Sequence, residues 1–133
     1  MPSFLLDTNI LSDLMRNPGG LVAKQTARVG EQSVCTSIIV LAEVRFGIAK
    51  RRSRRLAAQL VAILAGIEVF PFEAPADEIY GALRADLERS GGPIGANDTL
   101  IAAQALSLGM TLVTDNEREF ARVPGLRIEN WLR

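Results

Sequence analysis

Four acidic side chains follow or interrupt apolar stretches of this 133-residue chain. They are Asp7, Glu43, Asp98 and Asp115. Their carboxylate oxygens are hard donors of the kind that Mg²⁺ or Mn²⁺ prefers, and the absence of nitrogen or sulfur from the set argues against zinc. Carboxylates held close together cannot all stay ionised without a counter-cation. If the fold gathers these four residues, the sequence predicts a site for divalent metal.

Asp7 ends the apolar run that begins at Phe4, and Thr8 and Asn9 follow it. Such a run predicts a buried strand, and the polar residues after it predict the first turn of a helix. In open α/β sheets, ligands bind in the crevice outside the carboxyl ends of the strands. Asp7 is therefore a candidate ligand, although a role as helix N-cap explains the residue equally well.

Glu43 is the only polar side chain between Ile38 and Val44. A helix there would place a carboxylate among apolar neighbours, which costs several kcal/mol unless the group is protonated, paired or bound to metal. An arginine partner is the plain alternative, but adjacent Arg45 is poorly placed, because residues next to each other on a helix do not face each other. A ligand or catalytic role is favoured.

Asp98 and Asp115 extend the pattern. Asp98 falls in the first turn of a predicted helix, where the helix dipole favours an anion, so capping alone could account for it. Asp115 and Asn116 follow a short strand that ends at Thr114, just as Asp7 follows the first strand. Because parallel strands end at one edge of a sheet, three of the acids are expected at that edge.

The elements that position these residues alternate between strand and helix. Apolar runs and breaker residues predict strands over residues 3–6, 33–36, 67–72, 111–114 and 126–128. Helices are predicted over residues 8–15, 21–29, 38–50, 56–66, 75–89, 95–109 and 116–121. The alternation predicts an α/β/α sandwich around a parallel sheet of four to five strands. An apolar stripe along the fifth helix, at Ile79, Leu83 and Leu87, fits either a core or a dimer contact.

Length and composition exclude several classes of protein. The chain is expected to form one domain over residues 1–133, and it has no apolar stretch near the roughly 20 residues of a membrane span, so a soluble, cytoplasmic protein is expected. There is no histidine, which removes histidine-based triads and zinc sites. The single cysteine, Cys35, is expected to be a small buried hydrophobe, and Trp131 to anchor the tail by packing.

The charge balance does not exclude a polyanionic ligand. The chain has 15 basic and 15 acidic residues; if two divalent cations neutralise the four clustered acids, 15 basic residues face 11 acidic ones, a surface charge of +4. Residues 50–55 contain five basic side chains. This run is either a solvated connection between helices or a rim that contacts phosphates.

Two divalent cations about 3.5–4 Å apart stabilise the entering and leaving oxygens of a phosphoryl displacement and activate water without histidine. The predicted reaction is therefore hydrolysis of a phosphodiester. One alternative is a phosphotransferase with Asp7 as nucleophile, although Asn9 stands where such enzymes usually carry a second acid. The other is a non-catalytic module that binds metal, RNA or a partner protein through the acids.

Four pieces of the chain, in order over nearly its full length, resemble the PIN-domain ribonucleases and, among them, the VapC toxins of bacterial type II toxin–antitoxin pairs. They are Leu6-Asp7-Thr8-Asn9-Ile10-Leu11, Ser37-Ile38-Ile39-Val40-Leu41-Ala42-Glu43-Val44, Gly95-Ala96-Asn97-Asp98-Thr99-Leu100-Ile101-Ala102-Ala103 and Leu112-Val113-Thr114-Asp115-Asn116. The resemblance implies a PIN-like fold and a Mg²⁺-dependent endoribonuclease that cuts structured RNA, often tRNA. It also implies a homodimer, silenced by a VapB-type antitoxin whose C-terminal segment occupies the active-site groove.

The resemblance also implies roles for single residues. Asp7 and Asp98 resemble the principal metal ligands, and Glu43 resembles the acid that shares the metal and helps to activate water. The fourth position falls on Asp115, with Asn116 as the alternative. Supporting donors are expected at Thr8, Asn9, Thr114 and Asn116. Gln104 stands where many relatives carry histidine, and is expected to affect substrate or antitoxin contacts.

Overall fold

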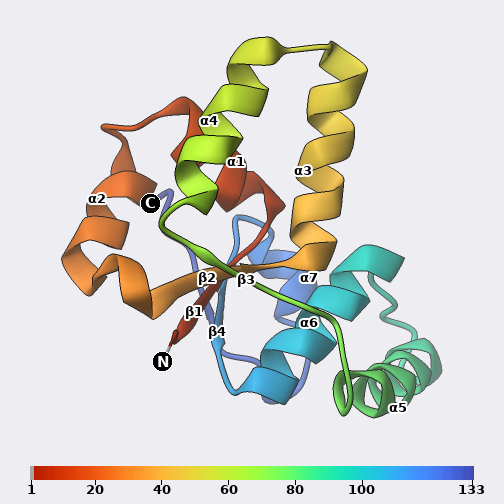
Figure 1. Cartoon of the computed structure of the whole chain (residues 1–133). Helices are drawn as coiled ribbons and strands as arrows, with labels where there is room; N and C mark the ends of the chain where they lie inside the picture. Colours follow the sequence, from red (N-terminus) through yellow and green to blue (C-terminus); the bar gives the residue numbers. More distant parts are fainter. Residues whose placement is uncertain (1) are drawn as a thin grey trace.

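The computed structural model describes residues 2–133 and alternates strands with helices along the chain (Figure 1). The strands are β1 (Phe4–Leu6), β2 (Val34–Ser37), β3 (Glu68–Phe70), β4 (Thr111–Val113) and β5 (Ile128–Glu129). The helices are α1 (Thr8–Arg16), α2 (Leu21–Val29), α3 (Ile38–Arg51), α4 (Arg54–Leu64), α5 (Ala76–Arg89), α6 (Ala96–Leu108) and α7 (Glu117–Phe120), with a short 3₁₀ turn, η1 (Glu31–Ser33).

All five strands lie in one parallel sheet in the order β3-β2-β1-β4-β5. Leu5 of β1 is in register with Cys35 of β2 on one side and with Leu112 of β4 on the other. The predicted parallel sheet of four to five strands is confirmed. The carboxyl ends of β1 and β4, which carry two of the predicted site residues, are direct neighbours.

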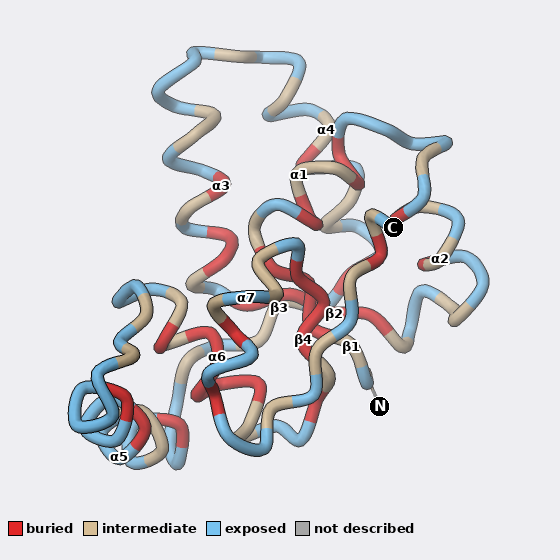
Figure 2. The backbone as a smooth tube through the Cα atoms, turned by 180° about the vertical axis from the view of Figure 1, so that it is seen from behind, coloured by how far each residue is buried: buried red, intermediate tan, exposed pale blue. Residues whose placement is uncertain are grey.

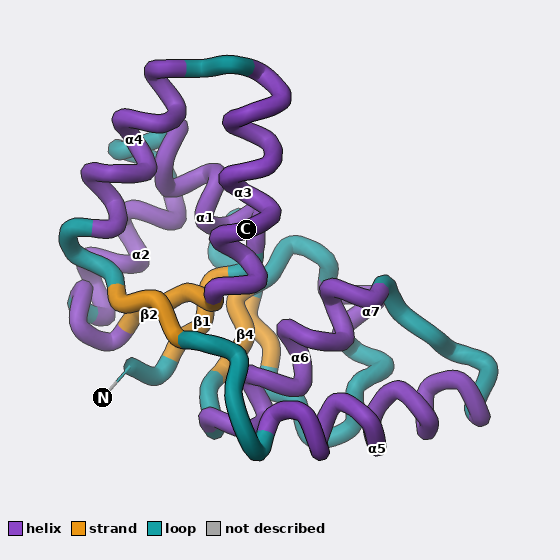
Figure 3. The backbone as a smooth tube through the Cα atoms, turned by 45° about the vertical axis from the view of Figure 1, so that its right-hand side comes forward, coloured by secondary structure: helices purple, strands orange, loops and turns teal. Residues whose placement is uncertain are grey.

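Helices cover both faces of the sheet, and the strands form the buried middle layer (Figures 2 and 3). Leu5, Cys35 and Leu112 belong to a core cluster with side chains of α3, α5 and α6. Leu6, Val34 and Val113, which point to the other face, pack with side chains of α1 and α2 and with Trp131. This alternation along each strand confirms the α/β/α sandwich.

Two of the three residues in the predicted α5 stripe belong to the core, whereas Ile79 is only partly buried and lies outside the core cluster. Leu83 and Leu87 are 7% and 4% exposed, and both lie in the cluster that fills the space beside α6. Cys35 is fully buried, and burial raises the pKa of its thiol to about 12, as fits a small hydrophobe. Trp131 is also buried, with its ring 5.1 Å from that of Phe4, so the tail is anchored as expected.

Three elements differ from the prediction by two residues at one end or both, and the remaining elements differ by at most one residue at either end. The third strand is half as long as predicted, because only residues 68–70 pair with β2. The last strand begins two residues later than expected, at Ile128, where pairing with β4 starts. The fourth helix begins at Arg54, since the Ser53 hydroxyl accepts a hydrogen bond from the Leu56 amide and caps it.

Within residues 2–133, no helix combines the length and apolar character needed to cross a bilayer.

Candidate active site

Asp7 lies directly after β1, buried to 6% exposure, and acts as the N-cap of α1. Its Oδ1 accepts a hydrogen bond from the Thr8 amide at 2.8 Å, and its Oδ2 accepts one from the Thr114 hydroxyl at 2.7 Å. Burial raises the pKa of this carboxyl, and the two hydrogen bonds oppose the rise. Capping therefore fixes the carboxylate at the sheet edge, so the two interpretations of Asp7 are compatible.

Glu43 projects from α3 toward the same edge and is partly buried. Its Oε1 accepts a hydrogen bond from the Thr8 hydroxyl at 3.2 Å, so Thr8 links it to Asp7 through its amide and hydroxyl. Burial raises the pKa of Glu43 most, and the charge of Asp7 raises it further. Across residues 2–133, Glu43 takes part in no ion pair, so the arginine-partner alternative has no support.

Asp98 sits in the first turn of α6, as predicted. The pKa of its carboxyl rises to about 7, chiefly through burial and then through the charges of Asp7, Glu119 and Glu43. A helix N-terminus alone would favour the ionised form and lower the pKa. The rise instead reflects burial of Asp98 beside other carboxylates, which capping does not explain.

Glu119 belongs to this cluster, and sequence reasoning missed it. From the single turn of α7, its Oε1 accepts a hydrogen bond from the Gly95 amide at 2.8 Å, and the Asn116 side chain donates to its Oε2. These two bonds lower the pKa of Glu119, so it stays ionised beside Asp98. No local signal in the sequence marks Glu119, because its contact with the Gly95 amide joins segments 24 residues apart.

Asp115 is exposed at the outer wall of the same hollow, and its Oδ1 accepts a hydrogen bond from the Asn130 side chain at 3.0 Å. It does not appear among the charges that raise the pKa of Asp98. Asn116 is less exposed, and its backbone N–H donates to the Thr114 hydroxyl at 3.0 Å. The role of Asp115 as fourth ligand stays a prediction. Of Asp115 and Glu119, it is Glu119 whose charge acts on Asp98.

A hollow of ≈ 330 Å³ collects these groups at the carboxyl edge of the sheet. It is lined by Asp7, Thr8, Asn9, Glu43, Asp98, Asp115 and Asn116. All eight residues predicted for the site, the four acids and their four supporting neighbours, therefore lie at or beside one hollow. Among them, Thr8 and Thr114 hydrogen-bond the acids directly, and Asn116 holds Glu119.

The donor chemistry of this hollow fits a hard divalent cation. Every candidate ligand is a carboxylate or amide oxygen. Burial, reinforced by the charges of neighbouring carboxylates, raises the pKa values of Asp7, Glu43 and Asp98. In the described part of the chain, no three His, Cys, Asp or Glu side chains are arranged to hold one ion unaided. Mg²⁺ suits such a site, because it is usually bound by one or two carboxylates together with water and substrate phosphates.

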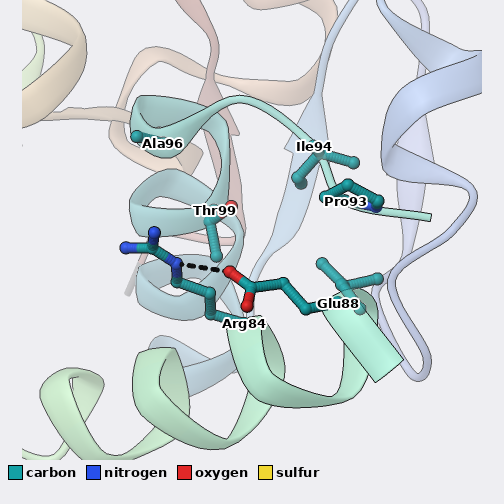
Figure 4. Close-up of a pocket in the computed structure, with 7 residues that line it drawn as sticks. Arg84, Glu88, Pro93, Ile94, Ala96 and Thr99 are labelled. Atoms are coloured by element: carbon teal, nitrogen blue, oxygen red, sulfur yellow. Dashed lines mark hydrogen bonds and ion pairs between the residues drawn. The ribbon is translucent and has the colours of Figure 1, made fainter. Parts of the chain in front are cut away.

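A smaller cavity of ≈ 150 Å³ lies between α5 and the start of α6 (Figure 4). An ion pair of 3.0 Å between Arg84 and Glu88, both on α5, lies in its wall, and the Thr99 hydroxyl donates to the Gly95 carbonyl. Pro93 and Ile94 complete the wall. Its polar groups are already paired, so the acidic hollow is the better candidate for chemistry.

Gln104 is buried, so its side chain offers no surface to a substrate or antitoxin, and an effect on their contacts stays a prediction that would act through its neighbours. It is 1% exposed; its side-chain amide donates to the carbonyls of Phe70 and Pro71, at 3.1 and 2.9 Å, and its carbonyl accepts from the Ser37 hydroxyl. Because Ser37 also caps α3, Gln104 ties the ends of β2 and β3 to α6. The residue supports the helix that carries Glu43.

Residues 4–126 match the PIN domain family. The chain is 36% identical over 130 residues to "Ribonuclease VapC2" of Rickettsia felis, covering 96% of this chain and 97% of that one. It is 36% identical to the "tRNA(fMet)-specific endonuclease VapC" of Shigella flexneri, with 98% and 99% coverage. The structure of VapBC2 from Rickettsia felis bound to a promoter DNA fragment superimposes with a TM-score of 0.88, at 34% identity, over 96% of this chain and 98% of that one.

A parallel sheet with acids at the ends of β1 and β4, joined by acids from α3 and α6, is thus the arrangement of a PIN domain, and the chain belongs to that family. Within this family, 36% identity over nearly the whole chain places it among the VapC ribonucleases. PIN-domain ribonucleases depend on divalent metal, which agrees with the donor set of the hollow.

Proposed function

We propose that this protein is the endoribonuclease toxin of a type II toxin–antitoxin system, and that it hydrolyses RNA phosphodiester bonds with Mg²⁺, or Mn²⁺ in its place. The observation that carries the proposal is the gathering of four carboxylates, Asp7, Glu43, Asp98 and Glu119, at one edge of the sheet. Such a cluster binds cations, and bound cations attract a polyanion.

Each side chain has a proposed part. Asp7, held by Thr8 and Thr114, is the fixed ligand, because both of its oxygens are oriented by donors. Asp98 is the second principal ligand. When bound, divalent cations would neutralise these acids and supply the Lewis acidity that stabilises the entering and leaving oxygens.

Glu43 is proposed to accept a proton from the attacking water. Its Oε1 is held by the Thr8 hydroxyl, and its raised pKa makes it a better base than an ordinary glutamate. Glu119 is proposed to complete the inner ligand set next to Asp98. Asp115 and Asn9, at the exposed side of the hollow, are proposed to act at its outer rim.

The substrate is proposed to be structured RNA, tRNA or rRNA, because a relative is named for its specificity toward tRNA(fMet). A VapB-type antitoxin is the proposed partner, since the similar structures are VapBC complexes. A homodimer and a cytoplasmic location, where such RNA occurs, complete the proposal. We also propose that residues 1–133 form a single PIN domain.

The test is to incubate the purified, partner-free chain with total tRNA and rRNA in Mg²⁺ or in EDTA. We expect discrete fragments with 5′-phosphate ends in Mg²⁺ only, and none with Asp7→Asn. The matched control is Asp77→Asn, which replaces an exposed aspartate in the first turn of α5 and should leave cutting intact.

Three outcomes would contradict the proposal. Cutting that persists in EDTA and in Asp7→Asn would remove the carboxylate mechanism. RNA binding without cutting at any Mg²⁺ or Mn²⁺ concentration would favour a non-catalytic binding module. A phospho-aspartate trapped at Asp7 would favour a phosphotransferase.

A further inference from the structure

Glu43 and Asp98 reach the acidic hollow from two different helices, α3 and α6, which the fold must hold at a fixed distance from each other. Both helices pack on the same core cluster beside the sheet, and they contact each other near the start of α3 (Figure 1). The contact includes a hydrogen bond, in which the hydroxyl of Ser37, the N-cap of α3, donates to Oε1 of Gln104 on α6. This bond therefore links the two helices that carry the acids.

Gln104 is itself held from a third direction. Its side-chain amide donates to the carbonyls of Phe70, at 3.1 Å, and of Pro71, at 2.9 Å, where β3 ends. Phe70 is in register with Ser37 across the pairing of β2 with β3. The ends of two strands, the cap of α3 and the second half of α6 thus meet at one side chain that is 1% exposed.

Packing alone does not account for a glutamine at this position. The neighbours of Gln104 on α6, from Ile101 to Ala105, are buried and apolar. A buried amide costs free energy unless its donors and acceptor are paired, whereas an apolar side chain of similar volume would fill the space without that cost. Hydrogen bonds, unlike apolar contacts, depend on direction as well as distance, so they fix how one helix is turned against the other.

Both ends of the link lie six residues from an acid, Ser37 from Glu43 and Gln104 from Asp98. Six residues of α-helix span about 9 Å, so a turn of about 10° around the link displaces a carboxylate by about 1.6 Å. A misplacement of about 1 Å in an active site costs about a hundredfold in rate. The direction of the link therefore bears on the distance between the two acids.

We propose that Ser37 and Gln104 form a positioning pair, which fixes the distance between Glu43 and Asp98 and so sets the metal affinity and the turnover of the site. This inference rests on the proposed function and adds to it two residues that lie outside the acidic hollow. Both are buried, so they act through the two helices and not on the substrate. Position 104 requires an acceptor for the Ser37 hydroxyl and a donor for a carbonyl of β3, a combination that neutral histidine also offers.

The first experiment measures Mn²⁺ binding by calorimetry in the absence of RNA. Gln104→Met keeps the volume but removes the hydrogen bonds, and should weaken Mn²⁺ binding at least about fivefold. Gln104→His keeps an acceptor and a donor, and should bind Mn²⁺ within about twofold of the unaltered protein. Two controls should also stay within about twofold. Val22→Ala lowers stability in the other core cluster, and Gln59→Met removes an amide on α4 whose buried oxygen has no hydrogen-bond partner within residues 2–133.

A double-mutant cycle tests whether the two residues act as one unit. Ser37→Ala alone should weaken Mn²⁺ binding at least about threefold, and adding it to Gln104→Met should cost no more than about twofold beyond the larger single effect. Losses that multiply would show that the residues act separately and would overturn the pair. Circular dichroism checks that each variant is folded, and if Gln104→Met is not, Ser37→Ala and Gln104→His carry the test.

Cleavage kinetics separate this inference from the proposed function. At saturating Mn²⁺, Gln104→Met should lower kcat about ten- to a hundredfold and leave the KM for RNA within about threefold, because no RNA contact is removed. If the unaltered protein binds Mn²⁺ but cuts no RNA, the proposed function fails, and the Mn²⁺ affinities still decide whether the pair positions the acids. If Gln104→Met is less stable but binds Mn²⁺ and cuts like Val22→Ala, the residue is only structural and the inference fails. Equal losses in Gln104→His and Gln104→Met would likewise overturn it.

Discussion

Replacing Asp98 with asparagine should stabilise the metal-free protein at pH 8 and change its stability much less at pH 5. Asp98 lies among Asp7, Glu43 and Glu119, and ionising it adds a negative charge to a partly buried cluster. Asparagine keeps the shape and can donate a hydrogen bond to Glu119 without that charge. A mutation in the candidate active site would thus increase the free energy of unfolding.

The pH dependence follows from the direction of the pKa change. The pKa of Asp98 rises from 3.8 to about 7 on folding, so the folded state holds a proton that the unfolded state has lost. Stability due to this proton is complete below pH 3.8 and is lost as pH rises toward 7. Above pH 7 the free energy of unfolding lost by ionising Asp98 no longer changes with pH. Asp98→Asn restores it, because asparagine does not ionise.

The expected gain is modest because water screens the cluster. At about 1.4 kcal/mol per pH unit, reduced for the partial exposure of Asp98, ionisation costs about 1–2 kcal/mol at pH 8. For a chain of this size, that free energy corresponds to a rise in Tm of about 3–6 °C. At pH 5 the rise should be under about half of this value.

The assay is thermal melting in EDTA at pH 5 and pH 8, repeated with Mg²⁺ at pH 8. The control is Asp77→Asn, which also replaces an aspartate in the first turn of a helix and should lower Tm slightly at both pH values. Mg²⁺ should raise the Tm of the unaltered protein but have much less effect on Asp98→Asn. If Asp98→Asn lowers Tm at pH 8, or behaves like Asp77→Asn, the carboxylates are not coupled as described.

Four further substitutions test other parts of the structure. Glu119→Gln should weaken Mn²⁺ binding at least tenfold, whereas Asp115→Asn should weaken it less than threefold, as measured by calorimetry; the reverse order would restore Asp115 as the inner ligand. Gln104→Ala should lower the free energy of unfolding, measured in urea, by about 2–3 kcal/mol, because the buried groups that hydrogen-bond to Gln104 would be left unsatisfied. A change under about 0.5 kcal/mol would contradict this. Trp131→Ala should cost about 3 kcal/mol by the same assay, and a neutral result would show that the tail is not anchored by packing.

The sheet and the acids at its edge were predictable because both depend on local patterns. The short apolar runs that end at Asp7 and Thr114 mark β1 and β4, and their equivalence implies a shared edge. Glu43 could be singled out because it is the one polar side chain in an apolar stretch of α3. Such signals need no knowledge of tertiary contacts.

Other features of the structure could not be predicted, because they depend on contacts between segments that are distant in the sequence. Glu119 looks like an ordinary charged residue of a short helix, and only the return of α7 over the sheet edge brings it to the Gly95 amide. The burial of Gln104 likewise follows from the position of α6 against β2 and β3. The start of β5 at Ile128 is set by its partner strand β4, not by its own sequence.

The most direct test of the metal-dependent mechanism is to measure bound Mn²⁺ and RNA cutting in the same samples. Free Mn²⁺ is followed by electron paramagnetic resonance while tRNA fragments are counted, for the unaltered protein, Asp7→Asn, Asp98→Asn and the control Asp77→Asn. Cutting should rise with occupancy in the unaltered protein and the control, and both should be lost together in the other two variants. Cutting without bound Mn²⁺, or full Mn²⁺ binding in Asp7→Asn and Asp98→Asn, would contradict the mechanism.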